Sequence, residues 1–142
     1  MNQLISFKPM SWPTKNFLHS FYTDEELLWI KAQLEESRKS KRKFQWVCIE
    51  RNLAKIGICL LEVAPPEFVY VSNLSIKEKH RRQGVGRIFM SHIETYCANI
   101  GINRLCLTPT EASLSFYQAL LFVPEPLIPG ILKKDIHPPL PK

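Results

Sequence analysis

A basic turn with two glycines, Arg81-Arg82-Gln83-Gly84-Val85-Gly86-Arg87, constrains this chain more than any other segment. It follows an apolar segment that we expect to be a strand, Phe68 to Ile76, and precedes an expected helix, Val85 to Ile100. Glycines let backbone N–H groups approach a ligand, and a helix N-terminus adds free donors and partial positive charge. Arginine guanidinium groups supply charge and paired donors for phosphate oxygens. The turn therefore predicts a site for a phosphorylated small molecule.

Two common phosphate-binding motifs do not fit this turn. A dinucleotide fingerprint beginning at Gly84 would place its third glycine at Phe89, whose side chain prevents close approach of helix and strand. A P-loop needs Gly-Lys-Ser/Thr at the helix start, where this chain has Gly86-Arg87-Ile88. The pattern that remains is Arg-x-x-Gly-x-Gly, preceded by Leu74-Ser75-Ile76 at the end of the expected strand.

This pattern resembles motif A of the GCN5-related N-acetyltransferases, the GNAT family, whose turn binds the pyrophosphate of acetyl-coenzyme A (acetyl-CoA). A second segment, residues 110–122, is similar to motif B of that family, and its matching residues are Ala112, Phe116, Tyr117 and Phe122. Thr110 stands where an asparagine commonly contacts the pantetheine arm, and Leu121 stands where glycine is usual. Without that glycine, we expect the chain to leave the helix without a left-handed cap.

The resemblance implies an enzyme that transfers the acetyl group of acetyl-CoA to a primary amine of a small molecule or protein. It implies that Tyr117 is the general acid for the departing thiolate. It also implies that the strand before the turn splays from its neighbour at a bulge and pairs with the pantetheine amides. The residues it assigns to coenzyme binding are Leu74, Ser75, Ile76, Arg81, Arg82, Gln83, Gly84, Val85, Gly86, Arg87, Thr110, Ser113 and Phe116.

The sequence leaves the general base open. Tyr70 stands where some members of the family carry a carboxylate, and Glu67, Glu62 and Glu50 are nearby alternatives. His80 has a suitable intrinsic pKa, but its position favours exposure or coenzyme contact. Proton removal through ordered water is an equal alternative. The acceptor amine does not follow from the sequence, and a homodimer is one open possibility for the oligomeric state.

The expected order of elements is strand, helix, three strands, helix, strand, helix, strand, over residues 3–7, 24–37, 43–51, 53–63, 68–76, 85–100, 102–107, 111–120 and 131–136. This order predicts an α/β fold: a mixed, mostly antiparallel sheet with helices on both faces, like the acyl-CoA N-acyltransferases, in one domain over residues 1–142. Thr23 and Glu26 form an expected capping box. Trp29 lies off the apolar stripe of its helix, so it could belong to the core or to the substrate side, and of the two we expect the core.

Composition limits the compartment and the partners. No apolar run approaches the roughly 20 residues of a membrane-spanning helix, and the first residues do not resemble a signal peptide, so we expect a cytoplasmic protein without a membrane partner. The four cysteines lack C-x-x-C spacing, so we expect free thiols in a reducing compartment and no metal.

The net charge of +6 comes in large part from residues 38–43. This basic cluster is either a solvated helix end or a guide for an acidic partner. We do not expect nucleic-acid binding, because the chain lacks basic residues interleaved with aromatic ones. The positive charge favours acidic or neutral acceptors over polycations. A catalytically silent CoA-binding module remains the alternative to an enzyme.

Overall fold

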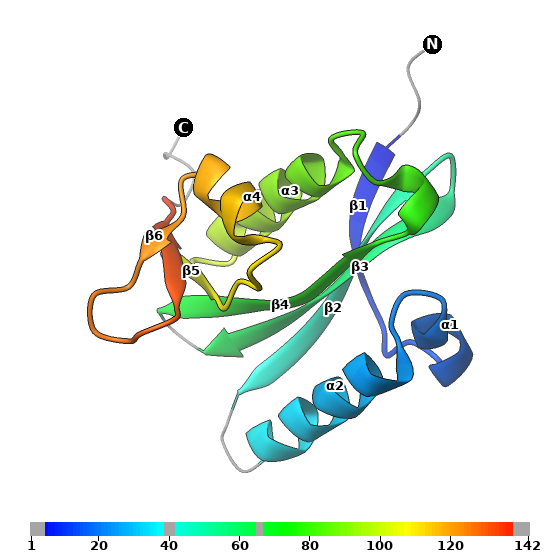
Figure 1. The fold of residues 1–142 in the computed structure, drawn as a ribbon, viewed down its shortest axis with the longest axis horizontal. Coiled ribbons are helices and arrows are strands. Elements are labelled where there is room, and N and C mark those ends of the chain that lie inside the picture. Colours follow the sequence, from blue (N-terminus) through cyan, green and yellow to red (C-terminus); the bar gives the residue numbers. More distant parts are fainter. Residues whose placement is uncertain (1–4, 39–41, 65–66, 138–142) are drawn as a thin grey trace.

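The computed structural model describes residues 5–38, 42–64 and 67–137, in which a seven-stranded sheet carries helices on both faces (Figure 1). The predicted α/β fold class is therefore confirmed. The strands are β1 (Ile5–Met10), β2 (Lys43–Arg51), β3 (Ala54–Ala64), β4 (Phe68–Ile76), β5 (Arg104–Leu107), β6 (Val123–Pro124) and β7 (Leu132–Asp135). The helices are α1 (Lys15–His19), α2 (Asp24–Ser37), α3 (Val85–Asn99) and α4 (Leu114–Ala119), with a 3₁₀ turn at Glu78–His80.

The sheet is mostly antiparallel, as the sequence predicts. Its spatial order is β1-β2-β3-β4-β5-β7-β6, and β4 with β5 is its parallel pair. Most element bounds agree with the prediction to within a few residues. The exceptions are α1 and β6, which were not predicted, and α4, which begins three residues later than expected. The start of the first expected strand and part of the 38–43 cluster lie outside the described residues.

Helices α3 and α4 cover one face of the sheet, and α1 and α2 cover the other (Figure 1). The larger core lies under α3, which buries Phe89 and Ile93 completely. The smaller core packs Ile30 of α2 against the sheet. Two core predictions are wrong. The apolar stripe of the helix at residues 85–100 predicts a buried Ile100, which is 50% exposed, and Trp29 is 63% exposed on α2. Trp29 is exposed because it lies off the stripe that buries Ile30.

Candidate active site

Strand β4 carries one extra residue where the site begins. Leu60 of β3 pairs with Ser72 and Ile58 pairs with Ser75, so that one residue of β3 faces two residues of β4. The first of these two, Asn73, is left-handed with φ of 58°, a conformation that asparagine tolerates better than most residues. This is a β-bulge, and it confirms the bulge that the sequence motif implies.

The bulge changes which side chains of β4 face each layer of helices. Beyond it, Leu74 and Ile76 pack against the core under α3. Ser75 faces the opposite layer, where its Oγ donates a hydrogen bond of 2.9 Å to the backbone carbonyl of Phe21. Since side chains alternate along a strand, the one-residue insertion reverses the pattern that the first half of β4 follows.

The second half of β4 has an open backbone edge. β4 pairs with β5 only from Phe68 to Tyr70, whereas β4 itself continues to Ile76. Within the described residues, no strand pairs with this edge beyond Tyr70. Free N–H and C=O groups on a strand edge can pair with an extended ligand that carries amides.

The turn after β4 combines a left-handed backbone with positive charge. Arg82 has φ of 62°, and Gly84, the N-cap residue of α3, has φ of 80°. Residues other than glycine seldom adopt positive φ, and such strain is concentrated at binding sites. No side chain caps the start of α3, so its first N–H groups are available to an anion.

Arg51, at the end of β2, contacts this turn although β3 lies between β2 and β4. Its Nη1 donates to Oε1 of Gln83 at 2.7 Å and lies 3.1 Å from Nδ1 of His80. Desolvation, followed by the charges of Arg51, Lys79 and Lys77, lowers the pKa of His80 below its ordinary value. The sequence analysis missed Arg51, because only the folded sheet brings the end of β2 beside the turn.

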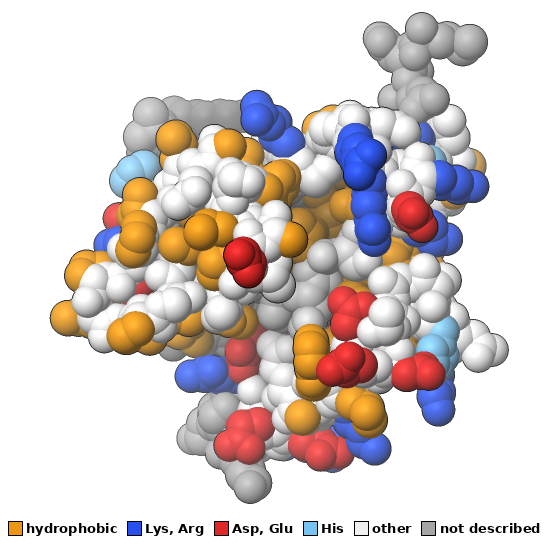
Figure 2. All heavy atoms as spheres, in the orientation of Figure 1, with side chains coloured by type: hydrophobic (Ala, Val, Ile, Leu, Met, Phe, Trp, Pro, Cys, Tyr) orange, Lys and Arg blue, Asp and Glu red, His pale blue; other side chains and the backbone are white. Residues whose placement is uncertain are grey.

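A groove of about 700 Å³ joins the turn, the end of β4 and the start of α4. In Figure 2, Lys and Arg side chains gather over the segment between β4 and α3, and acidic side chains gather below it over the start of α2. The lining residues that the sequence predicts are Leu74, Ser75, Ile76, Arg81, Arg82, Gly84, Val85, Gly86, Arg87, Ser113 and Phe116. The groove also includes Phe21, Glu26, His80 and Ala112, but Gln83, Thr110 and Tyr117 are not among its lining residues.

Gly86 allows close approach of α3 to α4. A Cβ atom at this position would lie 3.2 Å from Cζ and 3.3 Å from Cε1 of Phe116, which is tighter than ordinary contact. Ahead of α4, the backbone N–H of Thr110 donates to Oγ of Ser113 at 2.9 Å, and that of Ser113 donates to Oγ1 of Thr110 at 3.1 Å. These reciprocal bonds fix the turn where motif B commonly has asparagine.

The end of α4 corrects one expectation. Leu121 is left-handed with φ of 73°. Its N–H donates to the carbonyl of Gln118 at 3.0 Å, and the N–H of Phe122 donates to the carbonyl of Tyr117 at 3.1 Å. This pair of bonds is a Schellman cap. The prediction that Leu121 prevents a left-handed cap is therefore wrong, because the chain accepts the strained conformation at a side chain that is 73% exposed.

Tyr117 is buried between two aromatic rings at the inner side of α4. Its ring centroid lies 5.0 Å from that of Phe116 and 5.6 Å from that of Phe122. Burial, with a smaller contribution from the Cys59 thiol, raises the pKa of Tyr117 well above its ordinary value. The thiol of Cys59 in turn donates to the carbonyl of Ser72 at 3.3 Å. Tyr117 and Cys59 belong to the same buried cluster, and Cys59 is the residue of β3 that faces the bulge of β4.

The carboxylates that were candidate bases do not line the groove. Glu62 is buried, and it accepts from Oγ of Ser37 at 2.6 Å and from Nη1 of Arg42 at 3.3 Å. Glu50 forms ion pairs with two lysines at 3.3 and 3.7 Å. Glu67 is exposed in the connection between β3 and β4. Of the carboxylates in the described residues, Glu26 is the one that lines the groove.

The other candidate bases have polar partners. The hydroxyl of Tyr70 forms a hydrogen bond with Oγ1 of Thr108 at the point where β4 and β5 separate. His80 lines the groove, but its Nδ1 faces the guanidinium group of Arg51, which can only donate. Nδ1 is therefore the accepting nitrogen of the neutral ring, and its lone pair is already engaged.

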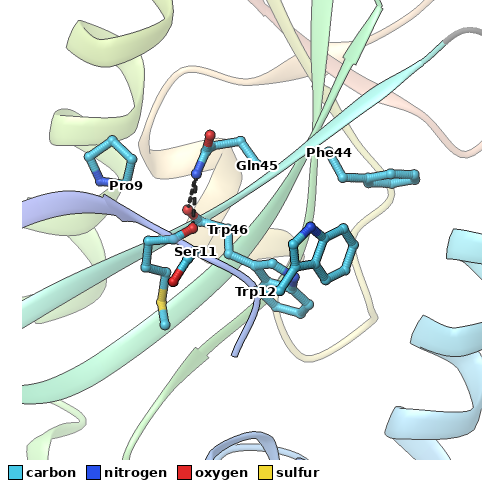
Figure 3. A pocket seen from close by; sticks show the side chains of 7 residues that line it. Pro9, Ser11, Trp12, Phe44, Gln45 and Trp46 are labelled. Atoms are coloured by element: carbon cyan, nitrogen blue, oxygen red, sulfur yellow. Dashed lines mark hydrogen bonds between the residues drawn. The ribbon is translucent and has the colours of Figure 1, made fainter. Parts of the chain in front are cut away.

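A separate cavity of about 380 Å³ lies between the end of β1 and the start of β2 and contains none of the predicted site residues. Figure 3 shows that the Gln45 amide there points to backbone carbonyls, those of Met10 at 3.1 Å and Trp46 at 2.8 Å.

Over the three described ranges, we find no group of three metal-ligating side chains and no helix long and apolar enough to span a membrane. The four cysteines are free thiols, and only Cys106 is partly exposed.

The sheet order, the bulged and open β4, and the basic turn at the start of α3 define a fold of the acyl-CoA N-acyltransferase class. The family model described as "Acetyltransferase (GNAT) family" matches residues 5–122. The chain therefore belongs to the GNAT acetyltransferase family. Membership of this family confirms the prediction of an N-acetyltransferase, whereas the acceptor is not identified.

Solved structures support the same fold. A GNAT acetyltransferase from Elizabethkingia anophelis with acetyl-CoA bound is 18% identical, with 93% of this chain and 98% of that chain covered and a TM-score of 0.67. The PaiA N-acetyltransferase from Thermoplasma acidophilum in complex with coenzyme A is 16% identical, with 93% and 99% covered and a TM-score of 0.64. The ribosomal-protein-S18-alanine N-acetyltransferase from Escherichia coli is 14% identical, with 94% and 95% covered and a TM-score of 0.64. Comparison with curated protein sequences gives no match.

Proposed function

We propose that this protein transfers the acetyl group of acetyl-CoA to a primary amine. The groove supports this proposal most directly, because it unites a basic turn, an open strand edge and the start of α4 in one cavity. Three of the similar structures hold acetyl-CoA or coenzyme A. The fold alone does not choose the acceptor, since one similar enzyme is named for an alanine of ribosomal protein S18 and another for an aminoglycoside.

The residues present fit the coenzyme. The N–H groups at the start of α3, with Arg82 and Arg87 beside them, suit a diphosphate. The open edge of β4 beyond Tyr70 suits the two amides of a pantetheine arm, which would extend the sheet. Gly86 keeps the floor of the groove free of a side chain opposite Phe116. Acetyl-CoA supplies the activated acyl group as a thioester.

We assign Tyr117 a hydrogen-bonding role toward the departing sulfur. Because burial raises the pKa of Tyr117, its hydroxyl stays protonated at neutral pH and remains a donor. An ordinary thiol has a pKa of about 8.5, so complete proton transfer from this hydroxyl to a thiolate would be unfavourable. A hydrogen bond that strengthens as negative charge grows on sulfur requires no such transfer.

The acceptor amine must lose a proton before it attacks, since an alkyl ammonium has a pKa of about 10.4. Glu62 and Glu50 are committed to partners outside the groove. Nδ1 of His80 is engaged with Arg51. We therefore favour removal of this proton through water.

We also propose, from the resemblance to the family, a cytoplasmic location and a homodimer.

The coenzyme site is tested by calorimetric titration of acetyl-CoA into the double variant Gly84→Glu/Arg87→Glu. Both changes place negative charge beside the diphosphate position, so binding should be abolished. The control is Gly130→Glu/Lys31→Glu, because Gly130 has φ of +82°, close to the +80° of Gly84, and a Cβ on either would have nothing within 4 Å. The control should bind like the wild type. Unchanged binding by the groove variant would contradict the placement.

One observation keeps the silent CoA-binding module as a second candidate: Tyr117 is 8% exposed and does not line the groove. Tyr117→Phe keeps the ring packing and removes the hydroxyl. In an enzyme, loss of this hydrogen-bond donor should lower kcat by about 10²–10³-fold with little change in acetyl-CoA affinity. Wild-type protein that binds acetyl-CoA but acetylates no amine in a broad screen would favour the module.

A further inference from the structure

One face of α2 borders the groove. Glu26, Trp29 and Gln33 lie three and four residues apart and therefore project from the same side of the helix. Glu26 lines the groove itself. Gln33 is bound to β4: its Nε2 donates to Oγ of Ser72 at 3.1 Å, and its Oε1 accepts from Nδ2 of Asn73 at 3.0 Å. The face thus runs from the groove to the bulge, with Trp29 between its two ends.

The Glu26 carboxylate is fixed in place but keeps bonding capacity. Its Oε1 accepts from the backbone N–H of Thr23 at 2.8 Å in the capping box. Its second oxygen has no hydrogen-bond partner among the described residues. Its negative charge is one of the causes, after burial and Cys59, that raise the pKa of Tyr22, whose hydroxyl donates to the carbonyl of Asn73. Glu26 therefore presents a carboxylate oxygen with remaining bonding capacity to the groove.

Trp29 gives this face an aromatic surface. Its side chain is 63% exposed, although large aromatic side chains are usually highly buried. An indole ring binds cations over its face and offers a large apolar surface to alkyl chains. A carboxylate and an exposed indole on one helix face are suited to an alkyl chain that carries positive charge.

Coenzyme binding would reverse the charge of the groove. The lining contains three arginines and one glutamate, which leaves two net positive charges when His80 is neutral. Coenzyme A carries about four negative charges in its phosphates at neutral pH. The occupied groove would then have about two net negative charges, and Glu26 is the carboxylate that lines it. Local charge thus favours a different acceptor from the one suggested by the net charge of the chain.

We propose that Glu26 and Trp29 select a cationic alkyl amine as the acceptor, and that bound coenzyme strengthens this selection. The inference rests on the proposed acetyl transfer and names the substrate class for that same groove. In an alkyl diamine, one ammonium group would pair with Glu26 and the chain would lie along Trp29. The other amine, once deprotonated, would attack the acyl carbon and release the coenzyme thiol.

Three probes of equal chain length test the proposal: 1,5-diaminopentane, pentylamine and 5-aminopentanoate. Each has a primary amine, and their far ends are cationic, neutral and anionic. In the wild type, kcat/KM should be about tenfold higher for the diamine than for pentylamine, and lowest for the amino acid. In a direct titration, the diamine should bind more tightly to protein saturated with coenzyme A than to coenzyme-free protein.

The test variant is Glu26→Gln, because glutamine can maintain the capping box. It should raise KM for the diamine about fivefold and change that for pentylamine by less than twofold. Glu25→Gln is the matched control, since Glu25 is an exposed neighbour that does not line the groove, and it should leave both values unchanged. Trp29→Leu should raise KM for both amines.

Acetyl-CoA affinity, measured by calorimetry in the same samples, separates the two proposals. If the wild type does not bind acetyl-CoA, the proposed function fails, and this inference fails with it. If it binds the coenzyme but acetylates none of the probes, or shows no preference for the diamine, only the acceptor assignment is overturned. Equal diamine kinetics in Glu26→Gln and the wild type would also overturn it.

Discussion

Removing the guanidinium group of Arg51 should weaken acetyl-CoA binding without any direct contact with the coenzyme. Arg51 does not line the groove, but its Nη1 contacts Gln83 at 2.7 Å and His80 at 3.1 Å. Both partners belong to the segment that leads into the start of α3. In Arg51→Met these contacts are lost, and the turn must be ordered by the ligand instead of being held in advance.

The size of the effect follows from the exposure of these contacts. A hydrogen bond to a charged group contributes about 1.5–3 kcal/mol in a protected setting. The bond to Gln83 is exposed, so we take about 1 kcal/mol, as for exposed charged pairs. This corresponds to an increase of about fivefold in the Kd for acetyl-CoA. Arg51→Lys keeps the charge but not the planar fork, so its Kd should lie between those of Arg51→Met and the wild type.

Two measurements check this prediction together. Calorimetry gives the Kd, and an NMR titration of the histidine ring gives the pKa of His80. The positive charge of Arg51 is one of the causes that lower this pKa, so Arg51→Met should raise it toward the ordinary value. Arg104→Met is the control, since it removes another guanidinium group, one that donates to Asp135 at 2.9 Å outside the groove. If the pKa rises while the Kd stays constant, Arg51 does not shape the coenzyme site.

Three further predictions concern backbone geometry. Gly86→Ala would place Cβ 3.2 Å from Phe116, so it should reduce acetyl-CoA affinity several-fold in calorimetry, and unchanged affinity would show that the groove can adjust. Gly57→Ala would place Cβ 2.7 Å from Cδ1 of Ile76 and should lower the free energy of unfolding, measured by urea denaturation, by about 1–3 kcal/mol. Adding Ile76→Val removes Cδ1 and should recover part of this loss. Additive losses in the double variant would argue against the clash. Leu121→Gly should raise the free energy of unfolding by about 0.5–1 kcal/mol, because glycine removes the left-handed strain at φ of 73°. A lower free energy of unfolding in urea denaturation would show instead that the exposed leucine contributes packing.

The fold and the coenzyme side of the groove were predictable because their signals are local in sequence. The turn and the start of α3 are continuous in the chain, and glycines and arginines have few other reasons to occur in that order. The capping box of Thr23 and Glu26 is likewise a short-range pattern, and the structure contains it. Short elements such as β6 had no such signal. β6 has only two residues, and pairing with β7 defines it.

The acceptor side could not be predicted in the same way, because folding assembles it from distant parts of the chain. Trp29 was expected in the core because it is large and hydrophobic, but it lies off the apolar stripe of α2 and is exposed. Glu26 was recognised only as a cap, yet the position of α2 beside β4 also brings it to the groove. The net charge of the chain gives the wrong expectation for the acceptor, because it takes no account of where folding places each charge. It sums lysines and arginines over the whole surface, whereas an acceptor responds to the few charges within a screening length of about 10 Å. Recognition of the coenzyme can therefore be predicted from one short turn. Recognition of the acceptor depends on how the two layers of helices are arranged about β4.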